Sequence, residues 1–368
     1  MKTINYKFKQ LKTEYDLTTL SATPEKTLFL DIETTGLSSQ TASIYLIGAC
    51  YFNNNVWHAI QWFAETPLEE AEIIHEFFKF ASDFSTLIHF NGNQFDLPFI
   101  LGRCKVHELS YNFEAFEGID IYKRVSLCKH FLQLPNCKQK SIEKFLHLNR
   151  EDKYSGGELI QVYKEYTKTP TRQNEELLLL HNRDDLKGMI EILPILSYCD
   201  IFNKPVRATK VQSNYYRDLS GKKQQELIIR LKLTSSVPIP VSYHANDCYV
   251  TVENTHAALR VPVYTEELKY FYHNYKEYYY LPMEDMAMHK SVASFVDKEH
   301  RVPATAATCY TRKYSSYLPM WDYVLEPFFK REYKSSLLFF ELTDDFKTNR
   351  EAFSKYASHI LEMLGKSH

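Results

Sequence analysis

The segment TLFLDIE (27–33) places two acidic residues at the end of a short apolar run that is typical of a buried β-strand. Side chains two apart on a strand point to the same face, about 6.6 Å apart along the strand, so Asp31 and Glu33 project together. Two neighbouring carboxylates repel each other unless a cation lies between them, and burying an unpaired carboxylate is costly. The pattern predicts a strand with a cation-binding pair, although the pair alone is also compatible with two solvated acids at a strand end.

Residues 27–200 alternate between strand-like and helix-like patterns. An Asn-Asn-Asn sequence between two strand-like segments is typical of a hairpin turn. Apolar residues have helical spacing over 67–83, a helix is expected to begin at Asp96, and most of 141–196 is expected to be helical. We therefore predict an α/β domain over 27–200, a mixed sheet flanked by helices, preceded by a polar N-terminal arm at 1–26. The expected strands are 27–33, 43–52, 56–65 and 85–92.

The chain changes character after residue 200. Residues 201–223 are basic and polar with little periodicity, so we expect a linker there. Residues 224–368 are expected to form a smaller α+β domain, and the length of 368 residues also favours two domains. Its expected strands are 226–233, 248–254, 304–311 and 335–342, and its expected helices lie near 284–296 and 344–364.

Composition narrows the cellular setting. No run of about 18 apolar residues occurs, so no membrane span is expected, and the polar N-terminus is unlike a secretory signal. The cysteines are scattered and contain no CxxC pair, which argues against a disulfide framework or a cysteine zinc site and favours a cytoplasmic protein. The net charge of -2 does not exclude nucleic acid as a partner, because binding requires local positive potential.

Asp96 is the next candidate ligand. It follows the strand-like segment 85–92 and stands two residues before Pro98, a spacing that is typical of a helix N-cap. One carboxylate oxygen can cap the helix while the other binds a metal. In open α/β sheets ligands gather beyond the carboxyl ends of the strands, where Asp31 and Asp96 are both expected.

A fourth carboxylate is expected in the helical segment 175–196. His181 and Asp185 are four residues apart, so they lie on one helix face. Asp185 shares its stripe with apolar residues and is expected to face the core, whereas Asp184 shares a stripe with charged residues and is expected to face water. His181 alone would be read as a surface histidine, but beside four acids it becomes a candidate general base, since imidazole titrates near neutral pH.

These segments, in this order, resemble the DEDD-type (DnaQ-like) 3′–5′ exonuclease superfamily, which has a ribonuclease H-like fold, and in particular its YprB-like branch. The resemblance covers about residues 28–196, just under half of the chain. One departure concerns the last motif: the superfamily has YxxxD or HxxxxD, whereas HNRDD (181–185) is HxxxD, which leaves the identity of the general base open. The matching segments are LFLDIETTGL, LIHFNGNQFDLPFI, LPNCKQKSIEKFLHL and HNRDDLKGMIEILPIL.

The resemblance implies hydrolysis of nucleic-acid phosphodiesters from the 3′ end by a two-metal mechanism that releases nucleoside 5′-monophosphates. Asp31 would contact both ions, Glu33 and Asp185 would bind the ion that carries the attacking water, and Asp96 would bind the other. His181 would accept the proton of that water. The two ions would be Mg²⁺ or Mn²⁺, because oxygen ligands suit these metals whereas zinc prefers nitrogen or sulfur.

The resemblance also implies substrate contacts. Thr34, Thr35, Gly36 and Leu37 directly follow the first two acids and would lie against the terminal nucleotide, and Asn91 would lie near the phosphate. The alternative is that Thr-Gly only turns the chain. The partner would be DNA or RNA, in particular a single-stranded 3′ end.

Two other functions are compatible with the sequence. One is a non-catalytic nucleic-acid-binding or scaffold protein that keeps the fold, and the other is a structure-specific endonuclease or a hydrolase of small phosphodiesters. The presence of all four acids argues against the first, because a dead site has no electrostatic reason to keep them together. The motifs leave the second open, because loops and the second domain determine whether a strand end is required.

The segment 309–336 mixes aromatic and basic residues. Rings can stack on bases while cations follow phosphates, so this composition suits single-stranded nucleic acid and makes the C-terminal domain a possible nucleic-acid-binding accessory. We favour the alternative, a half-buried tyrosine-rich core with a solvated basic rim. The residues concerned are Arg312, Lys313, Lys330, Arg331 and Lys334, with Tyr310, Tyr314, Tyr317, Trp321 and Tyr333.

Overall fold

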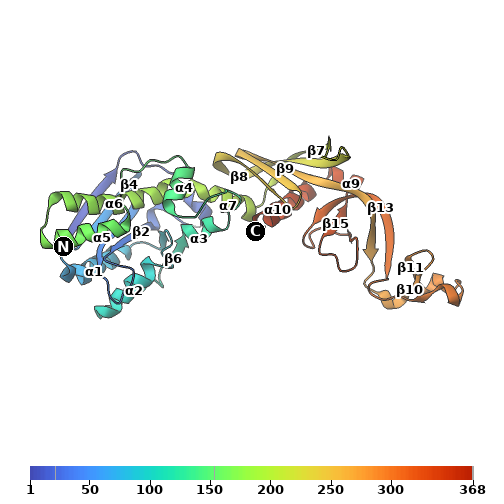
Figure 1. Cartoon of the computed structure of the whole chain (residues 1–368), viewed down its shortest axis with the longest axis horizontal. Coiled ribbons are helices and arrows are strands. Elements are labelled where there is room, and N and C mark those ends of the chain that lie inside the picture. The colour runs from blue at the N-terminus through green and yellow to red at the C-terminus, as the bar shows by residue number, and fades with distance from the viewer. Residues whose placement is uncertain (21, 153, 367–368) are drawn as a thin grey trace. The chain divides into compact units, whose positions relative to one another are not determined.

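The computed structural model describes residues 1–20, 22–152 and 154–366, and the chain divides into two compact units, Met1–Cys199 and Asp200–His368 (Figure 1). Each unit is built around its own sheet. Among the residues described, none of the helices has the length and apolar character needed to cross a bilayer.

The first unit contains a six-stranded mixed sheet flanked by helices, as the sequence predicts. In sheet order, the strands are β1 (Lys2–Phe8), β4 (Val56–Phe63), β3 (Ile44–Asn53), β2 (Thr27–Thr34), β5 (Thr86–His89) and β6 (Glu117–Asp120). The pairs from β1 to β2 are antiparallel, and β5 and β6 continue the sheet in parallel. Asn54 and Asn55 have positive φ angles, which asparagine tolerates, in the predicted turn between β3 and β4.

Seven α-helices accompany this sheet in the described part of the chain. They are α1 (Glu70–Ala81), α2 (Asp96–Val106), α3 (Ile121–Ser126), α4 (Gln139–Phe145), α5 (Gly156–Lys168), α6 (Arg172–Glu191) and α7 (Leu196–Asn203). The helix predicted over 67–83 is therefore confirmed, as is the helical character of most of 141–196. The α7 helix crosses the division between the two units.

Alternation along β2 determines which side chains meet which layer of helices. Leu28, Leu30 and Ile32 belong to a core that α1 and α2 complete. The other face of the sheet is covered by α6, which contacts β2, β3 and β4 and lies beside α5 (Figure 1). Because successive strand residues point to opposite faces, Asp31 and Glu33 point toward α6.

Buried Glu70 fixes α2 against the sheet. Its Oε1 accepts hydrogen bonds from the backbone N–H of Ile44 at 2.7 Å and from Arg103 Nε at 2.8 Å, and its Oε2 accepts one from Arg103 Nη2 at 2.6 Å. The Nε2 atom of His107 lies 2.7 Å from the same Oε2. A buried carboxylate is tolerated when its oxygens are satisfied in this way. The bonds join α1, β3 and α2, and α2 begins at Asp96.

The N-terminal arm predicted at 1–26 is wrong in part. Residues 2–8 form β1, which pairs with all of β4 from Lys2 opposite Phe63 to Phe8 opposite Trp57. An edge strand exposes one side to water and alternates only weakly in polarity, so its sequence resembles that of an irregular segment. The prediction failed because β1 is defined by its pairing with β4, a strand that is distant in the sequence.

The second unit is rich in β-structure. Its larger sheet has the order β14 (Phe328–Phe329), β15 (Leu338–Glu341), β13 (Tyr310–Met320), β9 (Cys248–Phe271), β8 (Lys223–Ala245) and β7 (Arg207–Arg217). A smaller sheet has the order β11 (Met286–His289), β10 (Tyr278–Leu281) and β12 (Val302–Pro303). The helices are α8 (Lys290–Ala293), α9 (Asp344–Thr348) and α10 (Arg350–Lys366), of which α10 packs on β7, β8 and β9.

Three predictions for this half of the chain need correction. The linker expected at 201–223 contains β7, an edge strand of the larger sheet whose outward side chains are polar. The strand expected at 304–311 begins only at Tyr310, and the helix expected at 284–296 is β11 followed by the short α8. The pattern failed because edge strands and short elements carry little periodicity of their own. The helix predicted near 344–364 is confirmed as α9 and α10.

Candidate metal centre

Asp31 lies on β2 opposite Gly48 of β3, below the helix α6. The Nδ2 atom of Asn182 donates hydrogen bonds to Asp31 Oδ2 at 2.7 Å and to the Asp31 carbonyl at 3.2 Å. Gln61 Nε2 donates to Asn182 Oδ1 at 2.8 Å, which fixes the orientation of that amide. A Cβ atom at position 48 would collide with the Asn182 amide, so glycine is needed for α6 to approach the sheet this closely.

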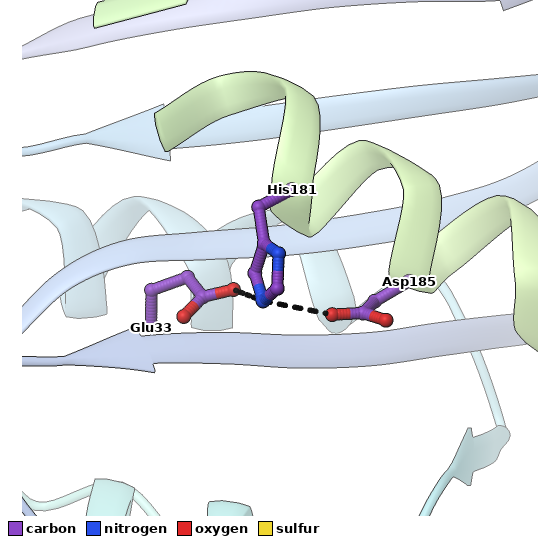
Figure 2. A group of neighbouring side chains, drawn as sticks. All are labelled: Glu33, His181 and Asp185. Atoms are coloured by element: carbon purple, nitrogen blue, oxygen red, sulfur yellow. Dashed lines mark ion pairs between the residues drawn. The ribbon is translucent and has the colours of Figure 1, made fainter. Parts of the chain in front are cut away.

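His181, Asp185 and Glu33 converge at the next position along the same face. Figure 2 shows His181 and Asp185 pointing from successive turns of α6 toward Glu33 on β2. The Nε2 atom of His181 lies 3.4 Å from Asp185 Oδ2 and 3.7 Å from Glu33 Oε1. One donor atom from each of the three residues falls within 4.8 Å of the others, a spacing that a single cation can bridge.

Asp96 approaches β2 from the beginning of α2. It is the first residue of α2, and its Oδ1 accepts a hydrogen bond from the backbone N–H of Ile32 at 3.2 Å. The residue at the N-cap position is Phe95, and no side chain caps the helix there. The carboxylate of Asp96 is thus used to contact β2 between Asp31 and Glu33, and the N-cap role that its spacing also allowed is not observed.

Burial and then repulsion between neighbouring acids raise the pKa of three of these side chains, Asp31, Glu33 and Asp96. Loss of solvent, followed by repulsion from its acidic neighbours, raises the pKa of Asp31 well above its usual value. Burial and then repulsion from Asp185 and Asp96 raise the pKa of Glu33 in the same direction. Burial raises the pKa of Asp96 to about 7, although the hydrogen bond from Ile32 acts in the opposite direction.

The prediction that Asp184 faces water is wrong. Asp184 is 7% exposed, and its Oδ2 accepts hydrogen bonds from the backbone N–H groups of Glu151 at 3.0 Å and Asp152 at 2.7 Å. The chain at 150–152 covers this side of α6, so the helix has two buried faces and a single apolar stripe does not describe it. Asp185 is the member of the pair whose carboxylate lies beside His181 and Glu33.

Two residues beside the site were missed by the sequence analysis. Asp152 Oδ2 lies 2.7 Å from His181 Nδ1, and Arg150 Nη1 lies 2.8 Å from Asp185 Oδ1. Burial alone would raise the pKa of Asp152, but hydrogen bonds from Tyr154 N–H and His181 lower it below its usual value. Both residues belong to the charged run NREDK (149–153), which by pattern is typical of a solvated loop, so the sequence contains no signal for them.

The residues predicted to contact substrate are mostly engaged in local structure. Thr34 Oγ1 donates to the carbonyl of Gly36 at 2.7 Å, and Thr35 Oγ1 accepts from the backbone N–H of Ser43. Leu37 is 87% exposed. These bonds are those of a chain turn, which was the alternative considered for this segment, and they leave Leu37 as the side chain that projects into solvent.

Asn91 adopts a positive φ of 60° after β5. Its backbone N–H donates to Asp120 Oδ1 at 2.9 Å, which ties the loop before α2 to the end of β6. Asp120 in turn is among the groups that raise the pKa of Asp96, after burial. The loop is therefore held next to the acidic cluster by its backbone.

The donor set fits divalent cations. Asp31, Glu33, Asp96 and Asp185 would bring four negative charges into one buried region, whereas Arg150 contributes one positive charge, which it shares between Asp185, Glu143 and Asp152. Carboxylate oxygens are hard ligands that magnesium and manganese prefer. Four negative charges and one positive charge leave a net charge of -3, midway between the charges of one and two divalent ions, so the number of two ions is what the resemblance implies.

The family-model match lies within the first unit. Residues 28–197 match the family model described as the RNase_H superfamily, so this unit has the ribonuclease H-like fold that the sequence predicts, followed by a sheet-rich unit. No curated protein sequence matches the chain. The assignment to the DEDD type and to the YprB-like branch remains a prediction.

Two solved structures illustrate the likeness. The family B DNA polymerase of Pyrobaculum calidifontis has a TM-score of 0.39 and 10% identity, over 67% of this chain and 34% of the polymerase. The zinc-bound complex of E. coli exonuclease I with single-stranded DNA has a TM-score of 0.28 and 14% identity, over 56% of this chain and 54% of the exonuclease. The chain thus spans about a third of the polymerase and just over half of exonuclease I.

The pKa of Asp96 predicts a pH dependence of stability without metal. The folded protein keeps this proton up to about pH 7, whereas the unfolded chain releases it near 3.8, so between these values the folded state binds more protons and this group lowers the free energy of unfolding as pH rises. In EDTA, Asp96→Asn should gain stability relative to the parent from about pH 4 to about pH 7 and then level off. Urea unfolding across this range measures the difference, and a difference independent of pH would contradict the assignment.

Proposed function

We propose that the first unit is a metal-dependent nuclease that removes nucleotides from the 3′ end of a nucleic-acid strand and releases nucleoside 5′-monophosphates. The observation that carries the proposal is the convergence of Asp31, Glu33, Asp96 and Asp185 from β2, α2 and α6 in one buried region. The acids would not be stable together there as charged groups without cations.

Each acid has a distinct place in the proposal. Glu33 and Asp185 would hold one ion, Asp96 the other, and Asp31, on the same strand as Glu33, would contact both. Ions held by these residues would supply stabilisation of the negative charge that develops on the phosphodiester oxygens during hydrolysis. Asn182 keeps the Asp31 carboxylate oriented through its 2.7 Å hydrogen bond.

His181 is proposed as the general base. Its Nε2 faces Glu33 and Asp185, next to the position assigned to the first ion, while its Nδ1 is bonded to Asp152. In the proposed tautomer Nδ1 donates its proton to the Asp152 carboxylate, so that Nε2 would be the ring atom that takes a proton from water. The geometry supports this role despite the HxxxD spacing.

The direction of digestion and the substrate contacts rest on the resemblance of the four motifs. A strand end would reach the acids past the turn at 34–37, where Leu37 is 87% exposed and available for contact with a base. Asn91 would contribute near the phosphate from its loop after β5. The assay below distinguishes this proposal from an endonuclease and from a protein that only binds.

The acids should be essential for activity. Asp31→Asn and Asp185→Asn should each reduce digestion to background, because each removes a charged metal ligand, while Asp83→Asn at an exposed position should have no effect. The substrates are 5′-labelled single- and double-stranded DNA and RNA with Mg²⁺ or Mn²⁺, resolved as a ladder. Shortening from the 3′ side supports the proposal, whereas internal cuts, binding without cutting, or full activity in the variants would contradict it.

The pairing of Asp152 with His181 can be tested with a double-mutant cycle. His181→Ala should slow turnover by about 10²–10⁴-fold, and Asp152→Asn should slow it by about 10–100-fold through misplacement of the ring. The proposal assigns Asp152 a role through His181 alone, so Asp152→Asn should cost nothing further in the His181→Ala background. Additive losses would show that Asp152 has another role, and an unchanged rate in His181→Ala would remove this histidine from the chemistry.

A further inference from the structure

A cavity of about 400 Å³ lies in the second unit, where β9 ends. Of the ten described residues that line it, six are aromatic, two are lysines, and none is acidic. The lysines are Lys330 and Lys334, and His273 is also at the wall. The aromatic residues are Phe271, Tyr272, Tyr275, Tyr323, Phe328 and Tyr333.

The backbone holds this wall in place. Lys269 on β9 and Lys330 exchange two backbone hydrogen bonds of 2.8 and 2.9 Å, which fastens the segment after β14 beside β9. Tyr333 packs edge-on against Phe271 with ring centroids 5.4 Å apart, and Tyr323 packs in the same manner on Phe328 at 5.0 Å. The rings are therefore positioned by the protein before any ligand arrives, which lowers the entropy cost of binding.

Two of these rings are unusually open to solvent. Tyr323 is 65% exposed and Tyr333 is 43% exposed, whereas Tyr310 and Tyr317 of the same segment are buried. Large exposed aromatic side chains at a cavity mark a binding site more often than a core. The alternative favoured for segment 309–336, a tyrosine-rich core, is right for Tyr310 and Tyr317 and wrong for the two rings at the cavity.

The basic residues of segment 309–336 also form two groups, those that pair with acidic side chains and those at the cavity. Arg312 pairs with Glu267 at 3.2 Å and Lys313 with Glu341 at 2.7 Å, so their charges are neutralised. Arg331 pairs likewise with Glu266. Lys330 donates only to the carbonyl of Tyr333, at 3.3 Å, and among the described residues neither Lys330 nor Lys334 has a carboxylate partner. Within segment 309–336, the basic residues without a carboxylate partner are thus the two lysines at the aromatic cavity.

We propose that this cavity binds a nucleotide of a single-stranded nucleic acid. The base would stack against Tyr323 or Tyr333, and Lys330 and Lys334 would contact the flanking phosphates. The volume lies in the range of about 300–1,000 Å³ that is common for small-ligand sites. An anionic strand fits the charge of the wall better than a neutral aromatic or proline-rich peptide, which would use the rings and leave both lysines unpaired. The use of this contact in digestion rests on the proposed nuclease function, but the binding does not.

Binding can be measured on the full chain by fluorescence anisotropy with a labelled single-stranded 20-nucleotide probe. The chain carries Asp31→Asn so that the probe stays intact. Tyr323→Ala should raise Kd by about 5- to 100-fold, the loss of one stacked base, and Tyr323→Phe should keep the parent affinity because the ring remains. Lys334→Ala should weaken binding. It should also lower the slope of log Kd against log salt concentration by about 0.7, because one phosphate contact is lost.

Matched controls lie on the same unit away from the cavity. Tyr314→Ala removes a ring that is 69% exposed, and Lys355→Ala removes an exposed lysine of α10; both should bind as the parent does. Equal affinity in Tyr323→Ala, Lys334→Ala and the controls would overturn the proposal, as would a parent that does not bind the probe. Thermal unfolding of each variant, monitored by circular dichroism, should be unchanged. A loss of affinity can then be attributed to the cavity and not to unfolding.

The cavity and the nuclease proposal can fail separately. In chains that keep Asp31, the cavity variants should raise the KM for a 20-nucleotide strand relative to the KM for a dinucleotide, because a dinucleotide whose phosphodiester is held at the acids has no further nucleotide to place in the cavity. A parent that digests neither substrate would contradict the nuclease function, while the anisotropy result would still decide whether the cavity binds a strand. If the cavity variants weaken probe binding but leave the ratio of the two KM values unchanged, the result would contradict a role of the cavity in digestion.

Discussion

The repulsion among buried carboxylates on one face of β2 is the constraint around which the first unit is organised. Alternation along the strand places Leu28, Leu30 and Ile32 in an apolar core and turns Asp31 and Glu33 to the opposite face. Asp96 contacts the same strand through the backbone of Ile32. Burial and mutual repulsion make the charged state of these carboxylates costly, which is the physical basis of the proposal that cations bind there.

The helix α6 is held to that position by contacts on two sides. Toward the sheet, Asn182 bonds with Asp31 and Gln61, and the lack of a side chain at Gly48 lets the helix come close. On its other side, Asp184 accepts two backbone hydrogen bonds from the 150–152 segment. That segment then supplies Asp152 and Arg150.

Those two side chains each hold one group of the site. Asp152 bonds with the ring of His181, and Arg150 pairs with one oxygen of Asp185, which leaves the other oxygen toward His181. Groups at a metal centre bind best when such neighbours fix their orientation in advance. The arrangement explains why Asp184, which touches nothing at the centre, is as buried as the residues that do.

The sequence predicted what is local and periodic. The two-residue spacing of Asp31 and Glu33 and the four-residue spacing of His181 and Asp185 each place a pair on one face of an element, whatever the rest of the chain does. The strands β1 and β7 were missed because they are edge strands, which are recognised by their partners rather than by their own pattern. Arg150 and Asp152 were missed for a related reason: a charged run near a turn is normally solvated, and only the packing against α6 makes it part of the site.

Segment 309–336 shows the limit of composition as a guide. Its tyrosines and basic residues look alike in the sequence, yet strand β13 buries Tyr310 and Tyr317 and pairs its cations with acids of neighbouring strands. On either side of β14, Tyr323 and Tyr333 stay exposed, and Lys330 and Lys334 line the same cavity. Which residues remain available to a ligand is decided by sheet register, a property that composition does not contain.

Direct counting of bound Mn²⁺ tests the central claim, that the converging carboxylates form a divalent-cation site. Free Mn²⁺ can be followed by electron paramagnetic resonance as the ion is added to the metal-free parent and to Asp31→Asn at neutral pH. The account predicts about two ions per parent chain, as in two-metal nuclease centres, and a loss of that binding in the variant. A parent that binds no Mn²⁺, or a variant that binds as many ions with the same affinity, would contradict it.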